Sequence, residues 1–373
     1  MRIAHIESSM HWGGQELRIV EQTEWLNEQG HPTWIIARPG SAILDKARQK
    51  ELPVYELPIR GAFSPVTLRR LLRFIDHQDI ELLDCHGNRD ASYGAYARWL
   101  TGVAVIRSRH ITDPLRHDAY NRLIWRRGNH RIVVTADAIA DHIVARKLST
   151  RDRIFVAEAG VDERRFHPAV DASALRQHLG ISPDQIVIAN IGMIRPDKGQ
   201  LQFVEASRQV LASHPNIVCV QIGEATADSE DYKRHVLDAA GEYVEQGRIR
   251  FLGYHDDIEQ WLALANIVVI ASIATEAKTR LVSQAFLMKK NIVATRVGGL
   301  PEMISHHHTG LLCPPNDGQA LAKAVESLIL DPILAEQLRE QAYRHALQSS
   351  TFDRMMAGML QTYEDALAAT QKR

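Results

Sequence analysis

Residues 267–302 read IVVIASIATEAKTRLVSQAFLMKKNIVATRVGGLPE. Residues 267–271 form an unbroken apolar run, as expected of a strand that is buried on both faces. A segment with helical apolar spacing follows, then a second apolar run at 292–294, and then Gly298-Gly299 before Pro301. The pattern predicts strand, acidic loop, helix, strand, glycine loop and helix. In a parallel sheet both loops lie at the carboxyl edge, where ligands bind.

The loop after the first of these strands has the chemistry of a ligand site. The helix that follows directs its free N–H groups and its positive dipole end toward the loop, which favours phosphate. Glu276 precedes the helix and could accept hydrogen bonds from hydroxyls, while Gln284 could bind a second polar group. A nucleotide sugar carries both phosphates and hydroxyls. The residues alone leave a simpler alternative open, in which Glu276 is only an acid at the helix N-terminus.

This stretch resembles the donor-sugar motif of the retaining GT-B glycosyltransferases of family 4, also called group 1, of the bacterial surface-polysaccharide and lipopolysaccharide type. The resemblance rests on Glu276, the helix after it and VGGLPE at 297–302. It implies that Glu276 contacts donor-sugar hydroxyls. The family places a second glutamate on the ribose, and here that position is Gln284. The further donor-binding residues implied at this loop are Lys278, Thr279, Arg280 and Leu281.

Length and charge limit the classes of protein to consider. A chain of 373 residues is long enough for two α/β domains. Its net charge of −1 provides no global field that would favour nucleic acid as a partner. Residues 1–168 nevertheless hold 25 Lys+Arg against 21 Asp+Glu, and the remainder holds 19 against 24.

Arginines account for most of the basic excess of the first half. Each one taken singly is predicted to lie on a solvated helix face. Together they could also contact anionic lipid headgroups or a phosphorylated acceptor. The arginines in question are Arg69, Arg70, Arg73, Arg107, Arg109, Arg116, Arg122, Arg126, Arg127 and Arg131.

Cysteine and hydropathy patterns predict a cytoplasmic protein, with possible contact at the cytoplasmic face of the inner membrane. Cys85, Cys219 and Cys313 lie in or beside apolar runs without CxxC spacing, so we expect buried thiols. No signal peptide and no membrane-spanning run is expected. The histidines at 306–308 are predicted to lie in an exposed loop, because consecutive side chains cannot converge on one ion. We expect no metal and no cofactor.

Alternation of strands and helices predicts a parallel sheet with helices on both faces in each half of the chain. The fold class expected is α/β of the GT-B type, in which two doubly wound Rossmann-like domains face each other across a cleft. The boundaries expected are 1–168 for the first domain, 169–351 for the second, and a terminal helix at 352–373 that returns to the first. The expected strands lie at 3–7, 33–37, 54–57, 81–85, 103–106, 131–134, 154–156, 186–191, 217–222, 249–253, 267–271 and 292–294.

The first predicted strand ends in a glycine loop. Gly13 and Gly14 precede a helix, so backbone there could approach a ligand phosphate, although most glycine pairs only mark turns. The sequence GGQE at 13–16 resembles the family's GGxE loop. The resemblance implies that Gly13 and Gly14 lie against the donor phosphates, and that Glu16 lies on the acceptor side.

Two further strand ends carry unusual polar residues. His86 follows one strand and His110 follows the next, both at expected carboxyl edges. The residues alone favour a loop histidine bonded to backbone at His86. HGNRD at 86–90 and RSRH at 107–110 resemble a subgroup of the family, which implies that His110 lies beside the donor sugar near the anomeric carbon. His86, Arg89 and Asp90 are then candidates for the acceptor side.

The second domain opens with a strand and the loop GMIRPDKG at 192–199, which precedes a helix. Cations at a helix N-terminus suit an anion, although a charged surface turn is also common. The loop resembles the family's GRLxxEKG, whose Arg and Lys hold the donor diphosphate. Lys198 matches the Lys, Met193 occupies the Arg position, and Arg195 is assigned the missing role. Gly223, at the next strand end, is expected to border the nucleotide base.

The function implied is transfer of a sugar from a nucleotide-sugar donor to an acceptor hydroxyl, with retention and without metal. A hexosyltransferase-like enzyme of lipopolysaccharide core or other surface-glycan synthesis is expected, with a glycan or glycolipid acceptor. His110, Glu276 and Lys198 are the predicted catalytic residues. The alternatives are a catalytically weakened GT-B protein that binds sugar nucleotides, suggested by Gln284 and Met193, and a sugar-nucleotide epimerase.

Overall fold

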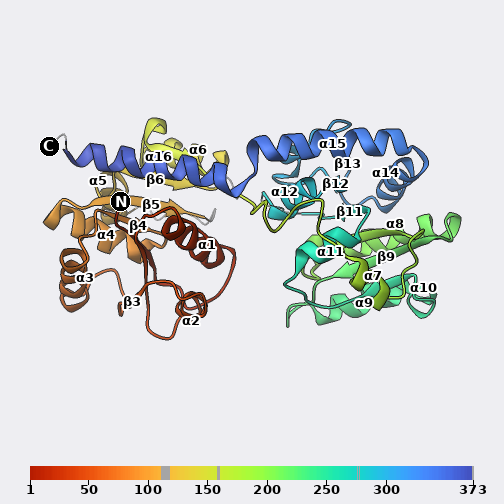
Figure 1. The fold of residues 1–373 in the computed structure, drawn as a ribbon, viewed down its shortest axis with the longest axis horizontal. Coiled ribbons are helices and arrows are strands. Elements are labelled where there is room, and N and C mark those ends of the chain that lie inside the picture. Colours follow the sequence, from red (N-terminus) through yellow and green to blue (C-terminus); the bar gives the residue numbers. More distant parts are fainter. Residues whose placement is uncertain (111–117, 158–159, 275, 277, 372–373) are drawn as a thin grey trace. The chain divides into compact units, whose positions relative to one another are not determined.

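The computed structural model describes residues 1–110, 118–157, 160–274, 276 and 278–371. The chain divides into two compact units, Met1–Glu158 with Met355–Arg373, and Ala159–Arg354 (Figure 1). The first unit thus ends before the boundary that the sequence suggested at 168, and the terminal segment from Met355 belongs to it.

The first unit is built on a seven-stranded sheet with the order β3-β2-β1-β4-β5-β6-β7, in which all pairs are parallel. Every expected strand of this half is present. Because β4 lies beside β1, the order reverses at that pair, and this is where doubly wound sheets bind ligands. The strands are β1 (Ile3–Glu7), β2 (Thr33–Ala37), β3 (Val54–Glu56), β4 (Leu82–Cys85), β5 (Ala104–Arg109), β6 (Arg131–Val134) and β7 (Ile154–Val156).

Helices cover both faces of this sheet. Leu71 of α3 and Tyr93 of α4 pack into one apolar cluster with Ala4 and Ile6 of β1. Helices α1 and α2 contribute to another cluster with Ile35 of β2. The helices of this unit are α1 (Gly14–Glu28), α2 (Ala42–Gln49), α3 (Pro65–His77), α4 (Asn88–Thr101), α5 (Ala119–Arg127), α6 (Asp137–Ala145), the 3-10 turn η1 (Arg151–Arg153) and most of α16 (Phe352–Gln371).

The second unit is built on a six-stranded parallel sheet with the order β10-β9-β8-β11-β12-β13. The stretch that opened the sequence analysis forms β11, α12, β12 and α13, in the order expected. The order of this sheet reverses between β8 and β11. The strands are β8 (Ile186–Ile191), β9 (Ile217–Ile222), β10 (Ile249–Phe251), β11 (Ile267–Ile270), β12 (Asn291–Thr295) and β13 (Leu311–Cys313).

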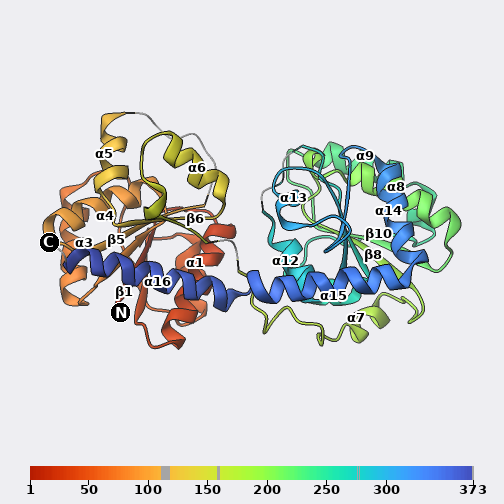
Figure 2. The same cartoon turned by 90° about the horizontal axis from the view of Figure 1, so that it is seen from above.

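Two apolar clusters hold the helices of the second unit to its sheet. One contains Phe203 of α8 and Val325 of α14, and the other contains Phe286 of α12 and Ala342 of α15. Figure 2 shows these two sets of helices on opposite sides of the strands. The helices are α7 (Ser173–His178), η2 (Pro196–Lys198), α8 (Gln200–Ser213), α9 (Glu230–Ala240), α10 (Glu242–Glu245), α11 (Ile258–Leu264), α12 (Arg280–Leu287), α13 (Leu300–Met303), α14 (Gly318–Leu330) and α15 (Pro332–Ser349).

Strand β5 differs from its prediction, because it continues through Arg109. Arg107 and Arg109 are therefore buried, and their prediction as solvated arginines was wrong. The Arg107 guanidinium lies 3.5 Å from the ring centre of Trp125 and donates to Asn88 Oδ1 at 2.7 Å, so stacking and a hydrogen bond replace its hydration. Arg116 lies outside the described residues.

Further expectations concern the burial of the cysteines, the exposure of the three consecutive histidines and membrane-spanning helices. All three cysteines are buried and free, as predicted, and the three consecutive histidines at 306–308 are exposed. No helix in the described ranges is both long enough and apolar enough to pass through a membrane.

Candidate functional site

An ion pair lies where the order of the second sheet reverses. Lys198 Nζ, at the end of the loop after β8, lies 2.9 Å from Glu276 Oε1 and 2.8 Å from Oε2, so it holds both carboxylate oxygens. Ser272 Oγ, just after β11, donates to the same carboxylate. The side chains of Lys198 and Glu276 are only 24% and 10% exposed. Two of the predicted catalytic residues are therefore in direct contact, at a partly desolvated site.

Backbone contacts fix the position of Glu276. Gly299 N donates to the Glu276 carbonyl at 2.8 Å. Gly298 has φ of +54°, and a Cβ there would lie 2.0 Å from the same carbonyl oxygen, so only glycine fits. The cap of α12 is Thr279, whose hydroxyl accepts from Leu281 N. The alternative in which Glu276 is only the acid at the helix N-terminus is thus not what the structure shows.

The remaining basic residues of this site also have acidic or carbonyl partners. Arg195 pairs with Asp197 at 3.2 Å, and its side chain is 43% exposed. Lys278 pairs with Glu302 at 3.1 Å, and Arg280 donates to the Gly160 carbonyl at 3.0 Å. The Arg195 side chain is thus more exposed than that of Lys278, which is 15% exposed.

The loops that flank the pair are tightly packed. Gly199 ends the turn η2 with φ of +69°, and a Cβ there would lie 1.9 Å from the Ala271 carbonyl oxygen, which brings the start of α8 directly against the end of β11. Gly223 follows β9, where its N–H donates to the Gly253 carbonyl at 2.7 Å. Leu281 and Gln284 lie half-buried on α12. The predicted donor residues of the second unit thus gather at one edge of one sheet.

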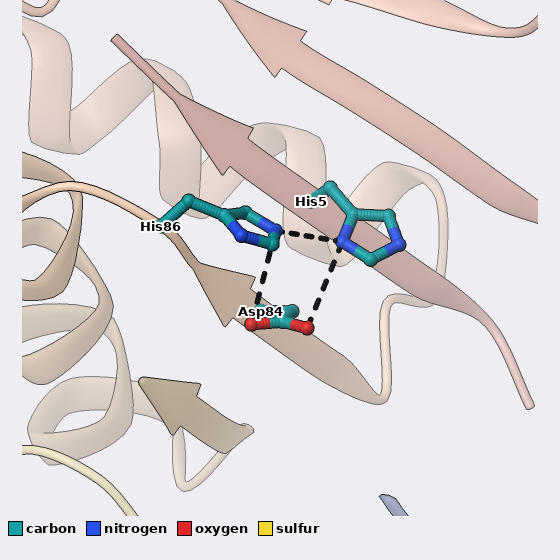
Figure 3. Close-up of side chains that lie close together, drawn as sticks. All are labelled: His5, Asp84 and His86. Carbon is teal, nitrogen blue, oxygen red and sulfur yellow. Dashed lines mark hydrogen bonds and ion pairs between the residues drawn. The ribbon is translucent and has the colours of Figure 1, made fainter. Parts of the chain in front are cut away.

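A row of hydrogen-bonded histidines lies at the corresponding edge of the first sheet. His5 of β1 and Asp84 of β4 are paired in register, so their side chains leave the same face. His5 Nδ1 lies 3.0 Å from His86 Nε2, and His86 Nδ1 lies 3.0 Å from His110 Nε2. Figure 3 shows His5 and His86 converging above Asp84. We call His5, His86 and His110 the histidine chain.

Asp84 is the acid beside the histidine chain. Its two carboxylate oxygens accept hydrogen bonds from Ser108 Oγ at 2.6 Å and from Tyr363 Oη of α16 at 2.8 Å. They lie 3.7 Å from His5 Nδ1 and 3.9 Å from His86 Nε2. Burial opposes ionisation, but the histidines and the two hydroxyls outweigh it and lower the pKa of Asp84.

Burial favours the neutral form of all three rings of the chain. Burial lowers the pKa of His5 below its usual value and that of His86 to about 3, against the raising effect of the Asp84 carboxylate. Burial and then the neighbouring His86 lower the pKa of His110 as well. His5 and His86 are buried, and the residue His110 is half-buried.

Two buried acids lie near the end of β1. Glu7 accepts from Ser9 N at 2.7 Å and from the Gln15 side chain, and Asp90 accepts from Gly87 N at 2.7 Å and from Ser8 N at 3.3 Å. Burial and then the Asp90 charge raise the pKa of Glu7 to about 8. Burial also raises the pKa of Asp90 to about 6. Both acids hold the loop in place through backbone amides.

The other candidates of the first unit are divided between surface and interior. Gly13 and Gly14 are exposed at the start of α1, Glu16 is buried in its first turn, and Arg89 is exposed on α4. The contacts of Asp90 are those of a helix cap, so its role on the acceptor side stays a prediction. Both ring nitrogens of His86 are hydrogen-bonded to ring nitrogens of His5 and His110. The interpretation of its side chain as a histidine bonded to backbone was therefore wrong.

Four residues that complete these sites were not anticipated: His5, Asp84, Ser272 and Tyr363. A single polar residue inside an apolar strand, such as His5 in IAHIE or Asp84 in LLDC, is the signal that could have found two of them. His5, Asp84 and His86 also form the one group, within the described part of the chain, whose ligand atoms are close enough to hold a metal ion.

Two family models match the chain. Residues 171–345 match the family described as "Glycosyl transferases group 1", and residues 12–165 match the one described as "Glycosyltransferase Family 4". The chain is 30% identical over 246 residues to a D-inositol 3-phosphate glycosyltransferase of Saccharomonospora viridis, a match that covers 64% of this chain and 56% of that protein. The chain therefore spans little more than half the length of that relative.

A second relative is covered more fully. The chain is 27% identical over 284 residues to the lipopolysaccharide core biosynthesis mannosyltransferase LpcC of Rhizobium leguminosarum, covering 75% of this chain and 77% of that protein. Among solved structures, Anabaena Alr3699/HepE in complex with UDP is similar with a TM-score of 0.83 and 21% identity, covering 98% of this chain and all of that one. That likeness shows a shared fold of two parallel-sheet α/β domains.

Proposed function

The chain belongs to the group 1 and family 4 glycosyltransferases, and on this basis we propose that it transfers a sugar from a nucleotide-sugar donor to an acceptor hydroxyl with retention at the anomeric carbon. The observation that carries the proposal is the contact of Lys198 with both oxygens of Glu276. The carboxylate can bind the hydroxyls of such a donor and the ammonium can bind its phosphates. Both groups are held at the same edge of the sheet.

Donor binding exchanges partners within this site. Lys198 turns from Glu276 toward the diphosphate, and the released carboxylate accepts hydrogen bonds from the sugar hydroxyls. Arg195 leaves Asp197 in the same way, and both cations then stabilise the departing diphosphate. Since two cations offset the phosphate charge, we propose that no metal ion is required. The Glu276 carboxylate accepts hydrogen bonds from the sugar hydroxyls and forms no covalent bond to the sugar.

We also propose that His110 binds a hydroxyl of the donor sugar. Its ring is hydrogen-bonded to His86, and a neutral imidazole can bind a sugar hydroxyl without attracting phosphate. UDP-sugars are the first donors to try, because the similar Anabaena protein was solved with UDP. Gln284→Glu, which restores the family's acid, is expected to tighten nucleotide binding, and Gln284→Leu to weaken it.

The test is turnover of the donor in the presence of EDTA. NMR of reactions with UDP-, GDP- and ADP-sugars should show one donor consumed, slowly alone and faster with a glycan acceptor, and a product with the anomeric configuration of the donor. An inverted product would contradict retention. Binding of a nucleotide sugar without any turnover would instead identify the weakened binding protein that Gln284 and Met193 suggest.

The acceptor is proposed to be a surface glycan or glycolipid, as the name of the Rhizobium relative suggests. A patch of the first unit supports a glycolipid. Phe63 packs edge-on against Tyr96, which hydrogen bonds to Tyr120 and packs edge-on against Trp99. We call these four residues the aromatic patch. Exposed arginines lie on α3, which follows Phe63 in the chain, at Arg69, Arg70 and Arg73, and on α5, which carries Tyr120, at Arg122, Arg126 and Arg127.

Aromatic rings and arginines together suit an anionic lipid surface. Trp99→Ser with Phe63→Ser should weaken binding to vesicles that contain phosphatidylglycerol, and added salt should weaken binding of the unmodified protein. Tyr254→Ser removes a ring of the second unit that is more exposed than either Phe63 or Trp99, and it is the control. Equal binding to neutral phosphatidylcholine vesicles, or binding that salt does not reduce, would contradict this contact.

A further inference from the structure

Two buried glutamines of the second unit contact the loop that carries Arg195. Gln200, the first residue of α8, donates from Nε2 to the Met193 carbonyl at 2.9 Å, and its Oε1 accepts from Arg195 N at 3.3 Å. Gln221 of β9 donates from Nε2 to the Gly192 carbonyl at 3.0 Å. The two glutamines are 1% and 0% exposed, so water does not compete for these hydrogen bonds.

The hydrogen-bond partners fix the orientation of each amide. A backbone carbonyl only accepts a hydrogen bond and a backbone N–H only donates one, so Gln200 must place its nitrogen at Met193 and its oxygen at Arg195. The Gln221 nitrogen likewise donates to two carbonyls, one of which is that of Gly192. Reversing either amide would place oxygen against oxygen. Both glutamines therefore donate to carbonyls of this loop.

The burial of Gln221 has a cost that its position in the sheet does not explain. Its Oε1 is buried and has no hydrogen-bond partner in the part of the chain that the structure describes. An apolar side chain of similar size would avoid the cost of desolvating that oxygen. The stability of the sheet alone therefore gives no reason for a glutamine here, whereas the hydrogen bond from its nitrogen to the loop does.

Carbonyl oxygens are the groups that an anion site must direct away from its ligand. Each carries a partial negative charge, so a peptide that turned its oxygen toward a phosphate would repel it. The hydrogen bonds from the two glutamines oppose such a turn at Gly192 and at Met193. Gln200 is itself rigidly supported, because the preceding residue, Gly199, packs directly against the end of β11.

We propose that Gln200 and Gln221 are positioning residues of the donor site, which hold this loop in the conformation that accepts a diphosphate and presents Arg195 to it. Their role rests on the proposed function, because the ligand is the diphosphate of the donor. Met193 occupies the position of the family's arginine, and its side chain cannot neutralise a phosphate. Gln200 bonds the backbone at both 193 and 195, so it fixes the segment from which Arg195 replaces the missing cation.

Asn190 offers a comparison with an amide that supports only the sheet. It lies on β8 in register with Gln221 of β9, and it is 4% exposed. Its Nδ2 donates to the Val269 carbonyl of β11 at 2.7 Å, so its hydrogen bond goes to a strand instead of the loop. Like the oxygen of Gln221, its Oδ1 is buried without a partner among the described residues. Asn190→Leu is therefore the matched control for Gln221→Met.

Binding of pyrophosphate to the full-length chain, measured by isothermal titration calorimetry in EDTA, tests the proposal without nucleotide or sugar. The unmodified chain should bind pyrophosphate, and Lys198→Ala should lose most of the affinity, which locates the binding at the donor site. Gln200→Met and Gln221→Met should each raise the Kd by about tenfold, comparable to the loss of one hydrogen bond to a charged group. Asn190→Leu should leave the Kd unchanged, although it should lower the Tm about as much as Gln221→Met does.

A double-mutant cycle shows whether Gln200 acts through Arg195. Arg195→Ala removes the cation, and Gln200→Met should then raise the Kd by less than it does in the unmodified chain. Additive effects would show that Gln200 does not position Arg195. Gln221→Met and its control keep the test decisive if Gln200→Met does not fold.

Three results would overturn the proposal: no binding of pyrophosphate by the unmodified chain, unchanged binding in Lys198→Ala, or the same Kd in Gln221→Met as in Asn190→Leu. The titrations are independent of sugar transfer. A chain that shows the expected Kd values but transfers no sugar contradicts the proposed function alone. A chain that transfers sugar, and whose affinity for pyrophosphate does not depend on the two glutamines, contradicts their positioning role alone.

Discussion

The two sheets reverse their strand order beside their first strand, β4 next to β1 in one unit and β11 next to β8 in the other. At this shared position the second unit holds charges that solvent reaches, in Lys198 and Glu276. The first unit instead buries a carboxylate, Asp84, beside histidines whose pKa values are lowered by burial. The same topology thus supports two kinds of site. The ions of the second unit can change partners, whereas breaking the buried hydrogen bonds of the first unit would cost free energy.

The largest effect is expected at the exchangeable charges. Glu276→Ala or Lys198→Ala should lower kcat/KM for donor turnover by about 10²- to 10³-fold, because each removes a group that binds the transferring sugar or the leaving diphosphate. Glu340→Ala is the control, since it breaks the more exposed Lys289–Glu340 pair of the same unit. If all three variants lost activity to the same extent, the Lys198–Glu276 pair would matter no more for donor turnover than the Lys289–Glu340 pair does.

The next effect concerns a buried acid of the first unit. The pKa of Glu7 is raised to about 8, so its ionisation costs folding free energy as the pH rises from about 4.5 through about 8. Glu7→Gln stays neutral, and its stability relative to the unmodified protein should rise across this window by several kcal/mol, at about 1.4 kcal/mol for each pKa unit, and then level off. Urea unfolding at several pH values measures it. A difference that does not vary with pH would show that Glu7 is not held protonated.

A smaller loss is expected when a hydrogen bond to the buried carboxylate is removed. Tyr363→Phe leaves Asp84 with one hydroxyl donor in place of two, and should lower the free energy of unfolding by about 1–3 kcal/mol. Thermal and urea unfolding, followed by a spectroscopic signal of the first unit, would measure this loss. No loss would indicate that the carboxylate finds another donor.

The smallest effect is expected for a solvated ion pair. Arg48 and Glu56 lie on the first unit with side chains 49% and 42% exposed. Arg48→Ala should change the free energy of unfolding by less than about 0.5 kcal/mol, because water screens the pair. A loss as large as that of Tyr363→Phe would mean that burial does not separate the two classes of interaction.

The sheets could be predicted from the sequence because parallel strands that are buried on both faces appear as apolar runs, as at 186–191 and 267–270. The residues Lys198 and Glu276 could also be named from their loops. Their contact could not, because it joins positions 78 residues apart and depends on β8 and β11 being neighbours.

The histidine chain was harder to predict. His110 and His86 follow strands and could be placed at the sheet edge, but His5 and Asp84 are single polar residues inside apolar strands and give no periodic signal. Tyr363, which completes the carboxylate site, lies 279 residues from Asp84 on a helix whose pattern shows only an apolar face. Strand β5 extended further than expected because Arg107 stacks on Trp125 in the interior.

The most direct test of the account is thermal unfolding with UDP-, GDP- and ADP-sugars in EDTA, for the unmodified chain, Lys198→Ala and Glu340→Ala. A ligand that binds only the folded state raises Tm. The account predicts that one nucleotide class raises the Tm of the unmodified chain and of Glu340→Ala, and that Lys198→Ala loses most of the shift. An equal shift in Lys198→Ala, or no shift with any nucleotide sugar, would contradict the assignment of the donor site.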